Sequence, residues 1–230
     1  NFKRRFRLQA LTTPCCGAVV SQIAAFQIRD NIRHRNDILH AYIEAINAAE
    51  HDILIANAYF LPGVRFGRAL QAAARRGVKI SVLLQGKTDH PLLRFATQAL
   101  YSAALESGIR IFEYEKSFMH AKVAVIDRHW ATVGSSNIDP FSLLLAKEAN
   151  LVVRDRPFAG ALEDSIRQVI ASGGREMGLA EMSCQPWHSR FMRRLSYGLV
   201  RALVGITGYG PKHWQADEET PGLTAEAAKQ

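Results

Sequence analysis

The sequence predicts an α/β fold, in which a β-sheet is covered by helices. Short apolar runs rich in β-branched residues, at 53–56 and 78–84, have the length of buried strands. Segments with apolar residues at helical spacing separate these runs, and this strand–helix–strand order is typical of α/β sheets. With 230 residues, 48% of them apolar, the chain is long enough for one sizeable domain plus appendages.

The first half of the chain is predicted to alternate between strands and helices. A strand near residues 18–28 comes first, and Asp37 is placed to cap the helix that follows it. Gly77 and Gly108 end the next two helices, as glycine commonly does. The predicted elements after the first strand are helix 38–49, strand 53–56, helix 64–76, strand 78–84, helix 92–105 and strand 109–114.

The second half begins with a predicted hairpin, whose strands 121–127 and 130–134 are joined around Arg128 and His129. A strand at 149–153 and a helix at 157–171, ended by Gly173, come next. Pro186 opens a last helical stretch, and residues 217–230 have the composition of a disordered tail. We therefore expect three parts: a linker and entering strand (1–29), a central domain (30–174), and a basic amphipathic segment with the tail (175–230).

The net charge of +8 is concentrated in two flanks of the chain. Residues 1–29 and residues 182–216 each contain five Lys or Arg and no Asp or Glu. Nucleic acid, anionic lipid or a phosphorylated substrate would each suit such flanks, and charge alone does not choose among them. Apolar runs fall short of the roughly 20 residues of a membrane-spanning helix, and three cysteines, two of them adjacent, do not form a disulfide framework.

The residues that carry chemistry gather between 118 and 153. His120, Lys122 and Asp127 have the spacing H-x-K-x-x-x-x-D. Because side chains alternate along a strand, His120 and Lys122 project from one face of the sheet and Asp127 from the other. An imidazole beside an ammonium suits a phosphate group. The imidazole can attack phosphorus or protonate a leaving oxygen, while the ammonium neutralises the non-bridging oxygens.

Further polar residues follow at fixed offsets, as Gly134, Ser135 and Asn137 in the pattern G-S-x-N. Ser135 and Asn137 offer uncharged donors for the same phosphate oxygens. Glu148 can hold one nitrogen of a histidine ring and leave the other free to react. A lone H-x-K is more simply a hydrogen-bonded core histidine and a strand-end cation. The full string arises by chance in about one in a million sequences of this composition, which favours a phosphate site.

The motif resembles the HKD signature of the phospholipase D superfamily. The segment HWATVGSSNIDPFSLLLAKEANLVV is similar to the second catalytic half of the bacterial cardiolipin synthase family, and within it to the type B enzymes. The stretches RDNIRHRNDI, ANAYFLPGVRF and FEYEKSFMHAKVAVID also resemble that family, so the similarity covers roughly residues 28–173. The resemblance implies a phospholipase D-like mixed β-sheet, flanked by helices on both faces, for residues 30–174.

The resemblance also implies a reaction and a role for each motif residue. The reaction is phosphatidyl transfer through a phospho-histidine intermediate; with phosphatidylglycerol as donor and acceptor, the products are cardiolipin and glycerol. His120 is then nucleophile or general acid/base, and Lys122 binds phosphate. Ser135 and Asn137 support the phosphate oxygens, Glu148 orients the histidine, and Asp127 has a structural, hydrogen-bonding role. The family needs no metal or other cofactor, and Cys15, Cys16 and Cys184 lack the spacing of zinc ligands.

The sequence departs from the family in one respect, because the family's active site uses two HKD motifs and this chain contains one. The chain is a fragment whose other half lies upstream, or it pairs with a second copy of itself, or it is inert alone. The first residue, Asn1, is not Met, and we favour the fragment. We expect the isolated monomer to have weak or no activity, because one imidazole would have to serve as both nucleophile and acid.

The C-terminal segment predicts contact with a membrane. On a helical wheel, an apolar stripe that includes Phe191, Leu195 and Leu199 opposes an arc of four arginines (Arg190, Arg193, Arg194 and Arg201). This pattern fits an interfacial helix within residues 187–209, or equally a helix docked on its own domain. We expect a peripheral enzyme on the cytoplasmic face of a bacterial membrane. The alternatives to a lipid enzyme are a single-HKD endonuclease that acts as a homodimer and an inert module that binds membrane or nucleic acid. The aliphatic residues 142–146 beside the motif make a nucleic-acid substrate the less favoured one.

Overall fold

The structure is a computed structural model that describes residues 23–204 apart from 31–32, 88–90, 140–141, 143–145 and 184–186. Within these residues an eight-stranded sheet has the order β1-β7-β6-β5-β2-β3-β4-β8. The strands are β1 (Ile23–Arg29), β2 (Asp52–Asn57), β3 (Lys79–Gln85), β4 (Arg110–Tyr114), β5 (Lys122–Ile126), β6 (Trp130–Gly134), β7 (Glu148–Arg154) and β8 (Gly174–Glu176).

The sheet is mixed. β2, β3 and β4 run parallel to one another, while every other pair of neighbouring strands is antiparallel. The parallel strands are joined through helices, as parallel connections require. The helices are α1 (Asp37–Asn47), α2 (Val64–Arg75), α3 (Pro91–Gln98), α4 (Tyr101–Glu106), α6 (Arg156–Gly173), α7 (Leu179–Ser183) and α8 (Trp187–Val204).

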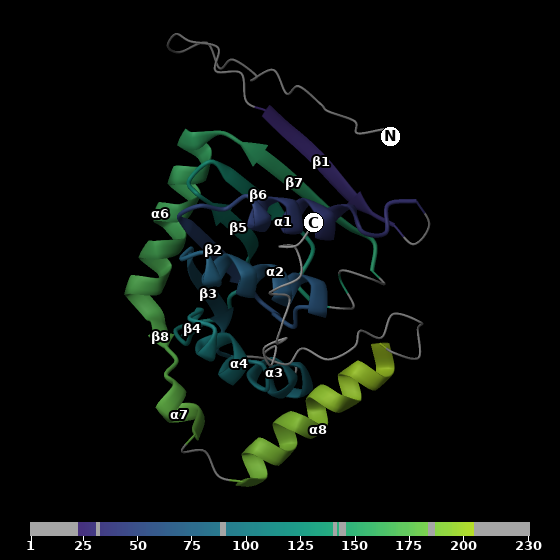
Figure 1. Cartoon of the computed structure of the whole chain (residues 1–230), viewed down its shortest axis with the longest axis vertical. Helices are drawn as coiled ribbons and strands as arrows, with labels where there is room; N and C mark the ends of the chain where they lie inside the picture. The colour runs from purple at the N-terminus through teal and green to yellow at the C-terminus, as the bar shows by residue number, and fades with distance from the viewer. Residues whose placement is uncertain are drawn as a thin grey trace, which may run out of the picture.

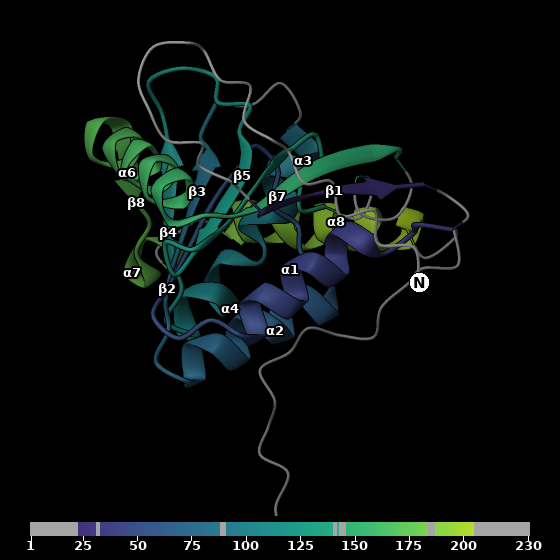
Figure 2. The same cartoon turned by 90° about the horizontal axis from the view of Figure 1, so that it is seen from above.

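Helices cover both faces of the sheet. Figure 2 shows α1, α2 and α4 on one side and α6 on the other. Ile46 and Phe66 pack with Ile53 on the first side, and Ile166 of α6 packs with Leu54 and Val125 on the second. Adjacent residues of one strand, such as Ile53 and Leu54, thus enter different cores, which explains the continuous apolar runs in the sequence. The predicted mixed α/β sheet with helices on both faces is confirmed.

Two local predictions were wrong. The helix expected at 92–105 is two helices, α3 and α4, because the turn between them lets two side chains reach one buried carboxylate. The side chains of Gln98 and Tyr101 donate to Glu113 Oε1 at 3.2 and 2.9 Å. Asp37 does not cap α1: it is the first helical residue, and its carboxylate contacts His34 Nδ1 at 2.8 Å.

The C-terminal part of the described chain adds elements that the sequence did not predict. β8 extends the sheet beyond β4, and α7 leads toward α8. α8 lies along α3, at the bottom of Figure 1. α6 and α8, the longest helices described, have 18 residues each, and neither is apolar enough to cross a bilayer. The expected linker at 1–17, the tail at 217–230 and all three cysteines lie outside the described residues.

Candidate active site

Apart from Asp127, the motif residues meet at one edge of the sheet, where β2 and β1 end, β5 and β7 begin, and β6 ends. We call this the motif edge. Strand register fixes the neighbours there: Asn57 of β2 pairs with Lys122 of β5, and Arg29 of β1 pairs with Glu148 of β7. Ser135 follows β6 directly and its backbone N–H donates to the carbonyl of Ala149 at 3.0 Å. Residues far apart in the sequence are therefore brought together by pairing alone.

His120 and Lys122 lie side by side but in different environments. His120 precedes β5 and its side chain is exposed, whereas Lys122 is 8% exposed. The Lys122 ammonium donates to the carbonyl of His120 at 3.4 Å. Burial lowers the pKa of Lys122, and the carboxylates of Glu148 and Asp139 oppose this shift. The result is a partly desolvated cation held against the backbone of a residue whose imidazole is exposed, an arrangement able to hold a phosphate oxygen.

Ser135 and Glu148 are joined directly. The Ser135 hydroxyl donates to Glu148 Oε2, and the backbone N–H of Ala149 donates to the same hydroxyl oxygen at 3.0 Å. Ser135 is exposed and Glu148 is partly buried. The hydrogen bond from Ser135 occupies one carboxylate oxygen of Glu148, and a carboxylate has a second oxygen with which to accept a further bond.

Two buried asparagine side chains bind the backbone of residues 136–138, which follow β6. The side-chain oxygen of Asn150 accepts from the Ser136 N–H at 3.3 Å, and that of Asn57 accepts from the Ile138 N–H at 3.4 Å. Between these two contacts lies Asn137, whose Oδ1 is buried and accepts no hydrogen bond within the described residues. An orphaned acceptor is costly, so this side chain is suited to a partner that arrives with a substrate.

Asp127 lies at the opposite end of β5 from Lys122, and the structure does not bring it to the motif edge. Its carboxylate accepts from the backbone N–H groups of Glu50, His51 and Asp52 at 2.8–2.9 Å. Burial raises the pKa of Asp127, but these hydrogen bonds outweigh burial and hold the pKa below its ordinary value. Asp127 ties the β5–β6 turn to the segment between α1 and β2.

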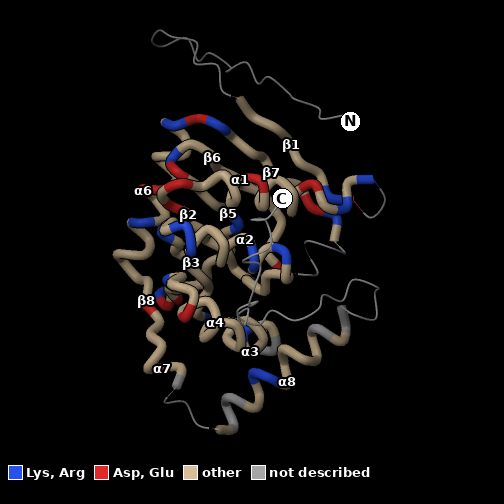
Figure 3. The backbone as a smooth tube through the Cα atoms, in the orientation of Figure 1, with Lys and Arg blue, Asp and Glu red and all other residues tan. Residues whose placement is uncertain are grey.

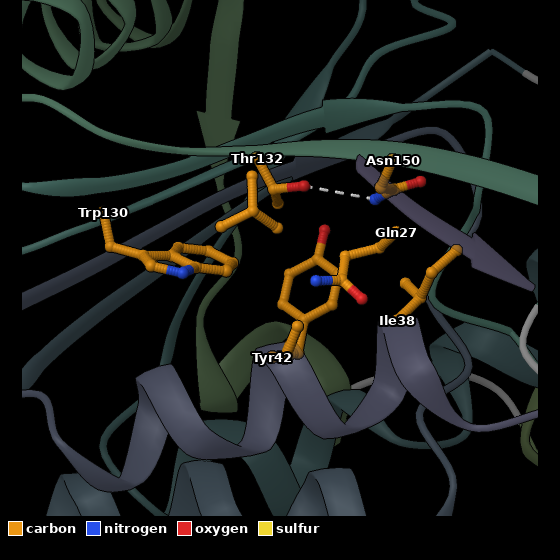
Figure 4. A pocket seen from close by; sticks show the side chains of 8 residues that line it. Gln27, Ile38, Tyr42, Trp130, Thr132 and Asn150 are labelled. Atoms are coloured by element: carbon orange, nitrogen blue, oxygen red, sulfur yellow. Dashed lines mark hydrogen bonds between the residues drawn. The ribbon is translucent and has the colours of Figure 1, made fainter. Parts of the chain in front are cut away.

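A small internal gap lies between α1 and strands β1, β6 and β7 (Figure 4). The amide of Asn150 donates to Thr132 Oγ1 at 3.3 Å, and the buried hydroxyl of Tyr42 has no hydrogen-bond partner within the described residues. Burial raises the pKa of Tyr42. The side chains leave no room for a water molecule, so this gap is not a substrate site. The open motif edge is the better candidate.

Comparison with known proteins matches residues 42–170 to the family model "Cardiolipin synthase, PLD-like domain". The chain belongs to this family. Cardiolipin synthase B of Shigella flexneri is 40% identical over 196 residues, which cover 85% of this chain and 46% of that protein. The family resemblance stated from the motifs is confirmed. The chain spans about half the length of these curated relatives that it matches.

Solved structures share the fold of this cardiolipin synthase family member. Nuc of Salmonella typhimurium, a phospholipase D family member, superimposes with a TM-score of 0.58 at 18% identity over 68% of this chain and 98% of that chain. Phosphatidylserine synthase of Haemophilus influenzae gives a TM-score of 0.64 at 10% identity over 85% of this chain and 50% of that chain. At these identities the likeness concerns the fold.

The structure adds residues to the site that the motif did not predict. Asn57, Asn150 and Arg29 are each at most 1% exposed, and all three lie at or next to the motif edge of this cardiolipin synthase-type domain. Their signal in the sequence is slight: each is a polar residue within or at the end of an otherwise apolar strand. Such a residue reaches the site only if its strand pairs with a strand that carries the motif. A single sequence does not reveal that pairing.

Proposed function

We propose that this chain supplies one half-site of a phosphatidyl transferase that makes cardiolipin. The observation that supports this most is the buried ammonium of Lys122 against the backbone of His120, whose imidazole is exposed, at the edge where Ser135 contacts Glu148. The names of its relatives support the lipid substrate, since cardiolipin synthase B matches along most of this chain.

The reaction needs two histidines. One ring nitrogen attacks the phosphorus of phosphatidylglycerol and a nitrogen–phosphorus bond forms. The bond from phosphorus to the oxygen of the headgroup glycerol breaks. A second histidine gives its proton to that oxygen and then takes the proton of the incoming hydroxyl of another phosphatidylglycerol. The hydroxyl oxygen attacks phosphorus, the nitrogen–phosphorus bond breaks, and cardiolipin and glycerol are the products.

Each side chain at the motif edge has a part in this scheme. His120 is one of the two histidines, and the Lys122 ammonium neutralises a non-bridging oxygen in a partly desolvated place. The amide N–H of Asn137 donates to a remaining oxygen, and the Ser135 hydroxyl does the same when it turns away from Glu148. Glu148 accepts a hydrogen bond from a ring nitrogen of one of the two histidines. It uses the carboxylate oxygen that does not accept from Ser135.

The second histidine belongs to another phospholipase D-like half, upstream in a longer protein or in a second copy of the chain. An exposed apolar sheet face next to the motif edge supports this docking. Phe26, Leu151 and Val133 are neighbours across β1, β7 and β6, and Phe26 is 47% exposed. Figure 2 shows β1 and β7 reaching beyond α6, which covers the other strands of that face. An apolar face beside an incomplete site is suited to the half that completes it.

We also propose that α8 holds the enzyme at the cytoplasmic face of the membrane. The apolar stripe of α8 faces outward: Trp187 is 74% exposed, and Phe191, Leu195 and Leu199 are exposed as well. Arg193, Ser196 and Val200 face the domain instead. Arg193 lies away from the apolar stripe, as the helical wheel predicts, but it is not available to lipid headgroups, because it is buried near Glu113 and contacts the sulfur of Met182 at 3.6 Å. An outward apolar stripe in an acid-free segment is suited to anionic lipid.

Incubation of the complete gene product with phosphatidylglycerol vesicles tests the proposal. We expect cardiolipin and glycerol in equal amounts, and loss of at least about a thousandfold of the rate in His120→Asn. His129→Asn is the matched control, since His129 is exposed in the turn at the other end of β5. The isolated monomeric chain should have weak or no activity.

A parallel incubation with plasmid DNA separates the alternatives. Cleaved DNA with intact phosphatidylglycerol would identify a nuclease and overturn the lipid assignment. If neither substrate changed with the complete gene product, the chain would be a binding module.

A further inference from the structure

Three arginines of α2 lie on one side of the helix and are exposed to solvent. At about 100° per residue, Arg65, Arg68 and Arg75 fall within an arc of about 80°. The opposite side of α2 packs into the core through Phe66 and Leu70. α2 contains no Asp or Glu, and its basic positions are blue in Figure 3. We call these three residues the arginine row.

The arginine row is unpaired within the part of the chain that the structure describes, where none of its side chains forms a hydrogen bond or an ion pair. Arginines elsewhere on the surface do have partners: Arg110, for example, contacts Glu176 at 2.7 Å. Arg76 follows the same helix, and its guanidinium donates to the carbonyls of Ile46 and Ala49 at 2.9 and 3.1 Å. The three guanidinium groups of the row are therefore available to a partner from outside.

Interactions within α2 disfavour the arginine row. Arg65 and Arg68 are neighbours at i, i+3, and like charges at this spacing repel each other. Arg65 also lies in the first turn, where the positive end of the helix dipole disfavours a cation. Proteins override such local preferences mostly at functional sites, and a row of cations is suited to an anionic partner.

The row begins next to the candidate active site. Phe60 forms a β-bridge with Ile138, and the Leu61 N–H donates to the Ile138 carbonyl at 2.7 Å. Ile138 belongs to the segment that follows β6 at the motif edge. α2 starts at Val64, shortly after this contact, and the row then extends about 15 Å along the helix to Arg75. An anionic surface bound by the row therefore passes close to the motif edge.

We propose that the arginine row binds the phosphate groups of an anionic lipid bilayer and keeps the motif edge close to the membrane surface. This rests on the proposed function, because the bilayer then holds the lipid substrate. Phosphatidylglycerol is anionic, so its charge complements the row, and the planar guanidinium matches the oxygens of a phosphate group. The row supplies an electrostatic contact, whereas the outward stripe of α8 supplies an apolar one.

Flotation of the full chain with vesicles tests the row without turnover. Three arginines near an anionic surface strengthen binding by about a hundredfold, since each contributes roughly fivefold. We expect the triple change Arg65→Gln, Arg68→Gln and Arg75→Gln to lose this factor with phosphatidylglycerol vesicles and to match the wild type with phosphatidylcholine vesicles. Added salt should weaken binding of the wild type much more than that of the triple variant, because it screens the headgroup charges.

A second triple variant serves as the matched control. It loses three positive charges from exposed positions at or next to the opposite edge of the sheet, by the changes Lys79→Gln, Arg154→Gln and Arg156→Gln. We expect it to bind phosphatidylglycerol vesicles as the wild type does. Glutamine is a good helix former, so α2 should keep its helical circular dichroism in the first triple variant.

Turnover by the complete gene product separates this inference from the proposed function. With short-chain phosphatidylglycerol dispersed as monomers, the arginine-row variant should keep kcat and KM within about twofold of the wild type, because the row does not touch the reacting groups. With vesicles, its apparent KM should rise about a hundredfold at unchanged kcat. If the wild type makes no cardiolipin, the proposed function fails, and vesicle binding alone decides on the row.

Three results would overturn the inference. The first is equal binding of the wild type and the arginine-row variant to phosphatidylglycerol vesicles. The second is a variant that loses binding to a DNA duplex and keeps binding to vesicles, which would assign the row to nucleic acid. The third is a variant that turns over monomeric lipid as poorly as vesicles, which would place the row in the substrate site.

Discussion

Gly134 and Asn150 pack so closely that no side chain fits at position 134. A Cβ placed on Gly134 would lie 2.1 Å from Oδ1 of Asn150 and 2.5 Å from the carbonyl of Ala149. The same Oδ1 holds the backbone of Ser136, so the close approach fixes the segment that carries Ser135 and Asn137. Glycine is therefore required in the G-S-x-N pattern because no room exists for a Cβ, and not because the backbone adopts a conformation that only glycine favours.

Gly134→Ala should destabilise the protein and displace Ser135. We expect a loss of about 1–3 kcal/mol in the free energy of unfolding, as for overpacked interiors, measured by denaturant titration followed by circular dichroism. Gly178→Ala is the control, because nothing lies within 4 Å of a Cβ at Gly178. Equal stability of the two variants would contradict this account of the β6–β7 pair.

Asp127→Asn should destabilise the fold and leave the arrangement of the side chains at the motif edge unchanged. The substitution removes the charge and one acceptor from the three hydrogen bonds to the backbone of residues 50–52. We expect a loss of about 1–2 kcal/mol at neutral pH. Glu50→Gln is the matched control, since the exposed Glu50 side chain loses the same charge from the same segment.

The effect of Asp127→Asn should also depend on pH. Because folding lowers the pKa of Asp127, its ionised form stabilises the folded state fully above the ordinary pKa, near 4. That contribution is lost as the pH falls through the lowered pKa of the folded state. Stability curves of the wild type and Asp127→Asn should therefore converge below about pH 4. A gap that stays constant down to pH 2 would disprove the role of the charge.

The outward stripe of α8 should determine binding to lipid. We expect the wild-type chain to float with vesicles that contain phosphatidylglycerol, and the triple change Phe191→Ser, Leu195→Ser and Leu199→Ser to reduce the bound fraction at least about tenfold. Ile23→Ser removes an exposed apolar side chain from the start of β1 and should bind as the wild type does. Undiminished flotation of the triple variant would rule out α8 as the contact.

The sequence predicted what depends on spacing along the chain. Alternation and the H-x-K pattern located Lys122 on β5 and Ser135 just after β6, and β-branched runs located the strands. The apolar stripe of α8 was also visible, but not the side it faces, because that depends on Arg193 finding a buried acidic partner in another element. Arg29 and Asn57 were missed for a similar reason: their places follow from pairing with strands that lie far along the chain.

The pairing of β1 with β7 has a consequence for how the protein is made. β1 spans Ile23–Arg29, yet its partner strand in the sheet spans Glu148–Arg154. During translation β1 leaves the ribosome before the other described strands of this sheet, and it stays without that neighbour until more than a hundred further residues have been synthesised. Its exposed apolar residues are open to wrong contacts in the meantime, since unpaired strands promote aggregation. The late pairing of β1 with β7 thus leaves the nascent chain open to aggregation for most of the synthesis of this domain.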